Sequence, residues 1–197
     1  MVGDWSTMSE MIDAPSTILT HLTENGDAFM VDVGPKADSV REATAQASIV
    51  MQASTAALIQ EGGLPKGDVL AVSRIAGLMG AKRTPDLIPL CHPIMITGAD
   101  VSFEWALPET TANDDPTGNQ RTTARLHIHA RVRTVGKTGV EMEALTAATV
   151  SALTIYDMCK AVDRGMMIDK IFLLSKYGGL SGTYDASHDL NGEPTRD

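Results

Sequence analysis

The sequence predicts an α+β fold in which an antiparallel sheet carries helices on one face. Residues 99–105, "ADVSFEW", and 125–133, "RLHIHARVR", alternate apolar side chains with polar or charged ones. This alternation is typical of antiparallel strands that bury one face and expose the other to water. Segments with helical spacing lie between the strand-like segments. Strands and helices mixed in this way favour two packed layers around one core.

The first part of the chain contains an arm and two strand candidates. Residues 1–20 are rich in Ser, Thr, Asp and Met and show no periodicity, so we expect a flexible arm. Residues 28–34, "AFMVDVG", alternate as a first strand would. Residues 40–51 fit a strand or a helix, and their periodicity does not decide between the two. The length of 197 residues fits one domain, which we place at residues 21–183.

Two helices are expected next. Ser54 is a plausible N-cap for a short helix over 55–61, which the glycines after it would stop. Asp68 is a plausible N-cap for a longer helix over 69–83, and Pro85 would mark its end. Five apolar residues fall on one face of this helix: Val69, Val72, Ile75, Ala76 and Met79.

The two alternating strands follow, and their outer faces carry opposite charges, so we expect them to pair. The connection between them at residues 108–121 is long, polar and rich in turn residues, which predicts a mobile hairpin loop. A long helix over 143–164 contains many small residues, which indicates close packing against another element or subunit. A last strand over 168–176 precedes a flexible tail at 184–197.

Composition excludes several classes of function. The net charge is −9 with no basic tract, so binding to duplex nucleic acid is not expected. No apolar run approaches the roughly 20 residues of a membrane helix. The N-terminus does not have the pattern of a signal peptide, so we expect a cytoplasmic protein. Two cysteines do not make a disulfide scaffold.

The heptapeptide "LIPLCHP" at residues 87–93 places Cys91 and His92 between two prolines. A structural zinc site needs four ligands, usually from spaced pairs, and the chain has no C-x-x-C, H-x-x-x-H or H-E-x-x-H motif. A zinc hydrolase is therefore not favoured. Cys91 is best read as a small buried hydrophobe. His92 fits a satisfied core histidine or a functional group in a stiffened turn, and both interpretations remain open.

Charged residues at turns and helix ends suggest a binding site for an anionic small molecule. Asp157 and Lys160 are neighbours on one helix face; they form either a surface ion pair of little consequence or a partly buried pair with shifted pKa values. Glu141 and Glu143 would share a side if that segment were extended. Lys137 lies in "GKTG", which lacks the spacing of a phosphate loop. The candidate cations are Lys66, Lys82, Arg83, His92, Lys137, Lys160 and Lys176.

Three long segments resemble the MoaC family of molybdenum-cofactor biosynthesis. They are "LTHLTENGDAFMVDV", "KGDVLAVSRIAGLMGAKRTPDLIPLCHP" and "GKTGVEMEALTAATVSALTIYDMCKA", and the similarity runs from about Leu19 to Gly182. The resemblance implies a catalytic domain with a ferredoxin-like two-layer sandwich, in a homohexamer built as a trimer of dimers with active sites at subunit interfaces. It implies a lyase that converts (8S)-3′,8-cyclo-7,8-dihydroguanosine 5′-triphosphate to cyclic pyranopterin monophosphate and diphosphate. No cofactor is required; magnesium on the triphosphate is possible.

The resemblance also implies roles for individual residues. Asp157, Lys66 and Lys160 match the family's catalytic positions. Substrate binding is implied for Leu90, Cys91, His92, Met142 and Glu143. Residue chemistry alone adds four further substrate-binding candidates, namely Glu141, Lys82, Lys137 and Lys176. The arm, the loop at 108–121 and Leu180 depart from the family pattern, and no function is assigned to them.

A second interpretation is a catalytically idle nucleotide-binding or assembly module on the same fold, because fold alone does not determine function. The paired Asp157 and Lys160 favour the enzyme, since a binding module has no need of them.

Overall fold

The computed structural model describes residues 25–106, 109–110, 122–179 and 182–186. Residues 1–32 and 33–197 form two separate units, and every helix and strand named below belongs to the second. The expected arm, Leu180, and most of the predicted loop and tail lie outside the described residues. At the margins of the last two, Glu109–Thr110 and Tyr184–Asp185 form short strands.

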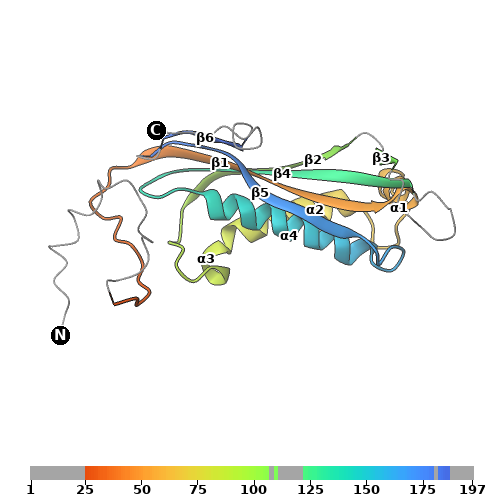
Figure 1. Cartoon of the computed structure of the whole chain (residues 1–197), viewed down its shortest axis with the longest axis horizontal. Helices are drawn as coiled ribbons and strands as arrows, with labels where there is room; N and C mark the ends of the chain where they lie inside the picture. The colour runs from red at the N-terminus through yellow and green to blue at the C-terminus, as the bar shows by residue number, and fades with distance from the viewer. Residues whose placement is uncertain (1–24, 107–108, 111–121, 180–181, 187–197) are drawn as a thin grey trace. The chain divides into compact units, whose positions relative to one another are not determined.

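The sheet is antiparallel throughout the described residues, as predicted (Figure 1). Its strands are β1 (Ser39–Gln52), β2 (Ile96–Trp105), β3 (Glu109–Thr110), β4 (Thr122–Gly136), β5 (Met167–Tyr177) and β6 (Tyr184–Asp185). Their order is β2-β4-β1-β5-β6, with β3 pairing to β4. Asp100 lies opposite Arg131 across β2 and β4, which confirms the pairing expected from their charges.

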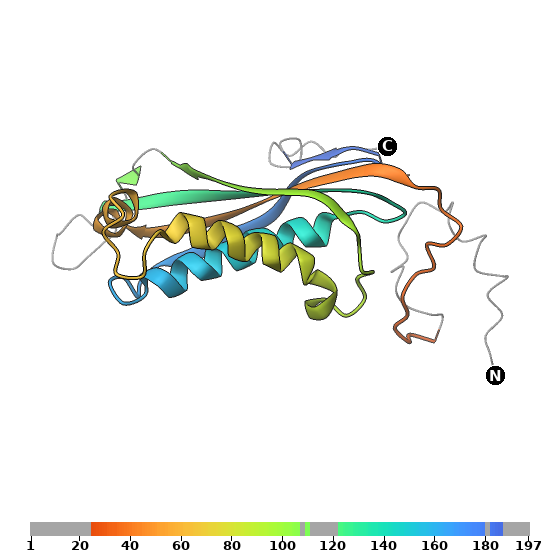
Figure 2. The ribbon, with the colours of Figure 1, turned by 180° about the vertical axis from the view of Figure 1, so that it is seen from behind.

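The helices are α1 (Ala53–Gln60), α2 (Val69–Lys82), α3 (Thr84–Leu87) and α4 (Glu141–Cys159). Figure 2 shows α2 and α4 side by side on one face of the sheet. The main elements therefore follow the βαββαβ sequence of a ferredoxin-like fold, with helices covering one face. No helix in the described part of the chain is long and apolar enough to cross a membrane.

Small residues let α2 and α4 approach closely. A Cβ on Gly77 would lie 2.2 Å from the Ser151 hydroxyl oxygen, and one on Gly80 would lie 3.0 Å from Val150. Ser73 and Ser151 each donate a hydrogen bond to the other's backbone carbonyl at this contact. The prediction that the small-residue helix packs against another element is confirmed.

Two predictions about the first half of the chain were wrong. Residues 28–34 form no strand, although exposure still alternates along them; the alternation signals extended backbone, not the partner that a strand needs. Ser54 lies inside α1, whose N-cap is Gln52 with no side-chain cap bond. Pro85 follows the end of α2 at Lys82, as predicted, and it lies in the first turn of the short α3, a position that suits proline.

Two further predictions about helices need correction. The long helix starts at Glu141 and ends at Cys159, where a turn begins in which Val162 N and Asp163 N donate to the Cys159 carbonyl. Of the five residues on the predicted apolar face of α2, only Val69 is fully buried. Val72, Ile75 and Met79 are exposed, and α2 instead buries Val69 with the small residues that face α4. Asp68 caps α2 as expected, because its carboxylate accepts from Ala71 N at 2.9 Å.

Candidate active site

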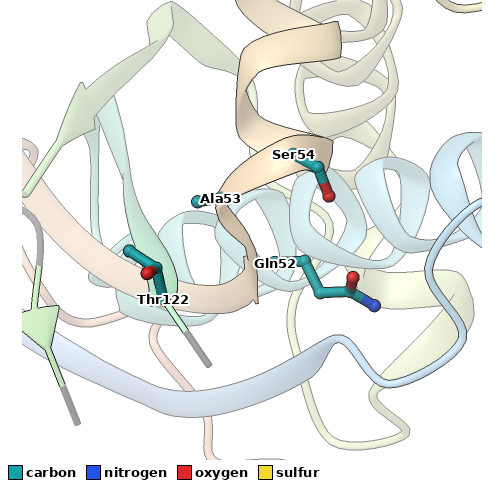
Figure 3. A pocket seen from close by; sticks show the side chains of 4 residues that line it. All are labelled: Gln52, Ala53, Ser54 and Thr122. Carbon is teal, nitrogen blue, oxygen red and sulfur yellow. The ribbon is translucent and has the colours of Figure 1, made fainter. Parts of the chain in front are cut away.

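A hollow of about 280 Å³ lies where β1 meets α1 (Figure 3). It is lined by Gln52, Ala53, Ser54 and Thr122. None of these is a predicted site residue, and their side chains offer hydroxyl and amide groups but no charge. The titratable residues that the sequence predicts for the site lie elsewhere, at the two ends of α4.

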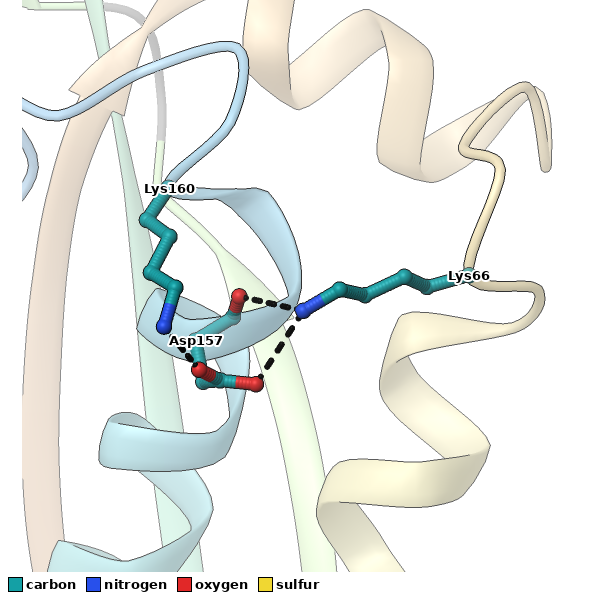
Figure 4. Close-up of polar contacts among 3 residues, drawn as sticks. All are labelled: Lys66, Asp157 and Lys160. Carbon is teal, nitrogen blue, oxygen red and sulfur yellow. Dashed lines mark hydrogen bonds and ion pairs between the residues drawn. The ribbon is translucent and has the colours of Figure 1, made fainter.

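Lys66, Asp157 and Lys160 form a cluster at the C-terminal end of α4 (Figure 4). The Lys66 ammonium donates to the Asp157 backbone carbonyl at 2.9 Å and to its Oδ2 at 3.2 Å. The Lys160 ammonium donates to Oδ1 of the same carboxylate at 2.5 Å. One carboxylate thus accepts from two ammonium groups, one on Lys66, 91 residues away in the chain, and one on Lys160, three residues away.

Local structure fixes each member of this cluster. Lys66 lies in a tight turn before α2, where Gly67 adopts a φ of +88° and donates to the Leu64 carbonyl. Lys160 is the C-cap of α4, three residues beyond Asp157 and therefore on the same side. A cation at this helix end also complements the helix dipole.

Asp163 holds the turn that follows Lys160, and the sequence analysis missed it. Its side chain is 2% exposed and accepts from Gln52 N at 2.9 Å, from the Thr55 hydroxyl at 3.2 Å and from Gly165 N at 3.1 Å. These bonds tie the end of α4 to β1 and α1. An aspartate two residues before a glycine was the available signal, because Asp often bonds backbone two residues on in turns.

The electrostatics of the cluster are those of an exposed ion pair. The hydrogen bonds from Lys160, and then from Lys66, lower the pKa of the Asp157 carboxyl below its ordinary value. Of the two alternatives that the sequence left open, the structure shows the exposed ion pair, because the side chains of Asp157 and Lys160 are 57% and 54% exposed. Asp157 is therefore an ionised, water-facing carboxylate whose charge is balanced by hydrogen bonds from two lysines.

Glu143 dominates the opposite end of α4. It is 2% exposed, and its Oε2 has no hydrogen-bond partner among the residues that the structure describes. Burial raises the pKa of this carboxyl from 4.5 to about 6, although its own backbone N–H partly opposes the shift. A buried carboxyl that titrates near neutrality, with one oxygen unpaired, is poised to bond or exchange a proton with a ligand.

Glu141 lies in the same first turn but points elsewhere. The shared side considered for Glu141 and Glu143 required an extended segment; the segment is helical, and in a helix residues two apart do not face each other. Glu141 pairs with Lys176 at 3.3 Å. A Cβ on Gly139 would lie 1.8 Å from Glu141 Oε2, so glycine is required there for the carboxylate to fold back.

The remaining substrate-binding candidates lie around this N-terminal end or on segments leading to it. The pKa of the Cys91 thiol is raised by burial and then by the charge of Glu143, which places "LIPLCHP" next to that carboxyl. Leu90, Cys91, His92 and Met142 are all half-buried. Lys137 donates to the Gly34 carbonyl at 2.5 Å, and Lys82 is exposed at the C-terminal end of α2.

The structure therefore separates the predicted site into two groups. Asp157 lies fourteen residues after Glu143 on α4, which at about 1.5 Å per residue is roughly 21 Å. We call Lys66, Asp157 and Lys160 the lysine end, and Glu143 with the "LIPLCHP" segment the glutamate end. No set of three or more His, Cys, Asp and Glu side chains in the described residues is arranged to hold a metal ion.

Comparison with known proteins gives one consistent result. The MoaC family model matches residues 30–179, most of the chain. A cyclic pyranopterin monophosphate synthase of Thermoanaerobacter pseudethanolicus is 53% identical over 167 residues, which are 85% of this chain and 97% of that protein. The synthase of Chloroflexus aurantiacus is 55% identical over 166 residues, 84% of this chain and 93% of its own. With this match spanning both ends of α4, the chain belongs to the MoaC family.

Proposed function

We propose that the chain is a cyclic pyranopterin monophosphate synthase of molybdenum-cofactor biosynthesis. Its substrate would be (8S)-3′,8-cyclo-7,8-dihydroguanosine 5′-triphosphate, and its products cyclic pyranopterin monophosphate and diphosphate. Family membership and the names of the relatives support this proposal. The observation in the structure that carries it is the lysine end, where two lysines share one ionised carboxylate.

At the lysine end, Lys66 and Lys160 would donate hydrogen bonds and exchange protons with the ring of the substrate as it opens and recloses. Asp157 would position both ammonium groups, since its lowered pKa makes it a poor proton acceptor. A substrate with several negative charges would replace the water that now surrounds these exposed lysines. Their interactions would strengthen as water leaves.

At the glutamate end, the unpaired oxygen of Glu143 would accept hydrogen bonds from the N–H edge of the guanine-derived ring. The backbone of Leu90 and Met142 and the side chains of Cys91 and His92 would complete this pocket. Glu141 would keep Lys176 in place through their ion pair.

In the last step, a substrate hydroxyl oxygen would bond to the α-phosphorus while the bond from that phosphorus to the bridging oxygen breaks. The leaving diphosphate takes the electron pair, and the hydroxyl proton passes to a base. Lys82, Lys137 and Lys176 are the cations that we propose for the triphosphate. The reaction needs no redox cofactor, and any magnesium would arrive on the substrate triphosphate.

We further propose that two copies of the chain build each active site. The two ends of α4 are roughly 21 Å apart, whereas groups that act on one substrate must converge on it. One copy would supply the lysine end and another the glutamate end, within a hexamer arranged as a trimer of dimers.

Diphosphate release from the purified substrate tests the proposed activity. The unsubstituted chain should turn over, whereas Lys66→Ala and Lys160→Ala should each lower kcat by at least about 10³-fold, a typical loss for a positioned proton-transfer group. Lys170→Ala, an exposed lysine on β5, is the control and should retain full activity. No release by the unsubstituted chain would favour the idle binding module, and near-normal turnover by either lysine variant would refute its proposed role.

A further inference from the structure

The face of the sheet opposite α2 and α4 carries a cluster of polar side chains on β1 and β4 (Figure 2). Ser48 lies opposite His127, and Gln46 lies opposite His129, in the register of the two strands. Paired residues of antiparallel strands point to the same face, so these four side chains meet there. The two histidine rings are stacked, with their centroids 6.4 Å apart.

The side-chain amide of Gln46 joins the two rings. Its Nε2 lies 3.2 Å from His127 Nδ1, and its Oε1 lies 3.0 Å from His129 Nε2. An amide nitrogen only donates and an amide oxygen only accepts, so His127 presents a lone pair to the amide and His129 presents an N–H. The hydroxyl of the buried Ser48 lies 3.2 Å from the same His127 Nδ1, where it acts as a second donor.

This arrangement limits how many protons the two rings can carry. In the orientation that the structure shows, His129 can become an imidazolium with the bridge intact, because its Nε2–H already donates to the amide oxygen. His127 can be charged only if the amide turns over, and the amide nitrogen then requires a lone pair on His129. In either orientation one ring keeps a bare nitrogen toward Gln46. The bridge therefore holds with at most one charged ring.

Charged groups on all four strands surround the pair. They are Arg125, Arg131 and Arg133 on β4, Lys170 and Asp169 on β5, Asp100 and Glu104 on β2, and Glu42 on β1. Asp169 pairs with Arg125, and Glu42 pairs with the other two arginines. Burial, and then the charges of His129 and Arg125, lower the pKa of His127, and Glu104 directly across on β2 offsets this only in part. The surroundings therefore oppose a second imidazolium, as the amide does.

We propose that Gln46, His127 and His129 form a proton-operated latch across β1 and β4. The latch is closed while at most one ring is charged, and it opens when the second ring takes up a proton. Histidine side chains titrate between about pH 5 and pH 8, so opening occurs on mild acidification. Because β1 and β4 pair from Ser39 to Gln52 within the sheet, an open latch weakens the fold.

The direction of the pH effect follows from the lowered pKa of His127. A group whose folded pKa lies below its ordinary value binds a proton less readily in the folded chain than in the unfolded chain. The stability that neutral His127 provides is therefore present above its ordinary pKa of 6.5 and is lost as pH falls. Glu143 acts in the opposite direction, because its raised pKa favours folding at low pH.

Nuclear magnetic resonance of the imidazole nitrogens tests the latch in the full chain. At neutral pH, Nδ1 of His127 should be bare and its proton should be on Nε2. On acidification the two rings should take up their protons at pH values at least about one unit apart, as coupled groups do. His127→Gln and His129→Gln assign the signals. Protonation of both rings at the same pH would overturn the proposal.

Gln46→Glu separates the effect of the amide from simple repulsion between the rings. A carboxylate accepts at both oxygens, so both rings can donate to it when charged. Both should then take up protons at higher pH than in the unsubstituted chain, and the gap between them should narrow. The control is Ser102→Ala, an exposed position opposite His129 on β2, which should leave both titrations unchanged. An unchanged gap in Gln46→Glu would overturn the role of the amide.

Denaturant unfolding provides a second measurement. Between about pH 8 and pH 5, the folding equilibrium constant of the unsubstituted chain should fall about tenfold more than that of His127→Gln, which has no ring to charge. Glu143 is present in both chains, so its contribution cancels. Equal pH dependence in the two chains would overturn the latch. Neither experiment uses substrate, so failure here is distinguishable from failure of the proposed activity.

Discussion

The two ends of α4 hold carboxylates in opposite environments. At the lysine end, Asp157 is 57% exposed and accepts from two ammonium groups, which lowers its pKa. At the glutamate end, Glu143 is 2% exposed with an unpaired oxygen, and burial raises its pKa to about 6. One carboxyl therefore stays ionised well below neutral pH, whereas the other takes up a proton as pH falls toward about 6.

Neither carboxylate is explained by a contribution to the stability of the fold. An exposed ion pair adds little to folding, so the convergence of Lys66 and Lys160 on Asp157 is poorly explained as a stabilising device. A buried carboxyl with an unpaired oxygen opposes folding, so Glu143 is also poorly explained that way. Environments that push two pKa values apart in this manner are characteristic of paired catalytic groups.

Complementation between subunits tests whether the two ends belong to one site, and it has the largest expected effect. Lys160→Ala and Glu143→Gln should each be inactive alone. After subunit exchange at equal amounts, about a quarter of the sites should be intact, because half of the random two-fold pairs are mixed and each has one complete site. The measurement is diphosphate release before and after mixing.

The matched control mixes Lys160→Ala with Lys66→Ala, which alter the same end. No site in that mixture contains both lysines, so it should stay inactive. Equal recovery in both mixtures, or no recovery with exchange confirmed by mass spectrometry, would count against a site shared by two copies.

Sequence reasoning succeeded where the interacting residues are close in the chain or share a repeating pattern. The i, i+3 spacing predicted the contact of Asp157 with Lys160, and alternation predicted β2 and β4 with their opposed charges. The contact of Lys66 with Asp157 spans 91 residues, and only the family resemblance linked them. Alternation failed at residues 28–34, because a pattern in one segment does not reveal a partner strand.

Burial was the least predictable property. The apolar face of α2 was recognised, but Val72, Ile75 and Met79 turn away from the core, because α4 accepts the glycines of α2 instead. The sequence left open whether Asp157 is exposed or partly buried, and it gave no sign that Glu143 would be buried. Which side of a helix faces the core depends on neighbours far along the chain.

Glu143→Gln tests the raised pKa of the Glu143 carboxyl through the pH dependence of the unfolding free energy. The folded pKa of Glu143 lies above its ordinary value, so the protonated form is favoured on folding. The stability that this carboxyl provides is fully present below pH 4.5 and is lost as pH rises through about 6. Glutamine stays neutral, so between pH 4 and pH 8 the variant should gain about 1–2 kcal/mol of unfolding free energy relative to the unsubstituted chain.

Denaturant titrations at several pH values measure this gain. The matched control is Glu141→Gln, which alters the half-buried carboxylate two residues away that pairs with Lys176. That variant should show no comparable gain with rising pH. A difference for Glu143→Gln that is independent of pH would mean that its carboxyl is not shifted by burial.

The smallest expected effect is on stability at the lysine end, and it contrasts two aspartates six residues apart. Asp157→Asn should abolish turnover but leave the thermal midpoint within the scatter of replicate measurements, because the group is exposed and its ion pairs are screened by water. Asp163→Ala should lower stability by about 1–3 kcal/mol, because it leaves buried donors of β1 and α1 unpaired. Calorimetry of both variants checks this. A large drop in the midpoint for Asp157→Asn would mean that the lysine end is a structural brace, and the loss of turnover would then need no catalytic explanation.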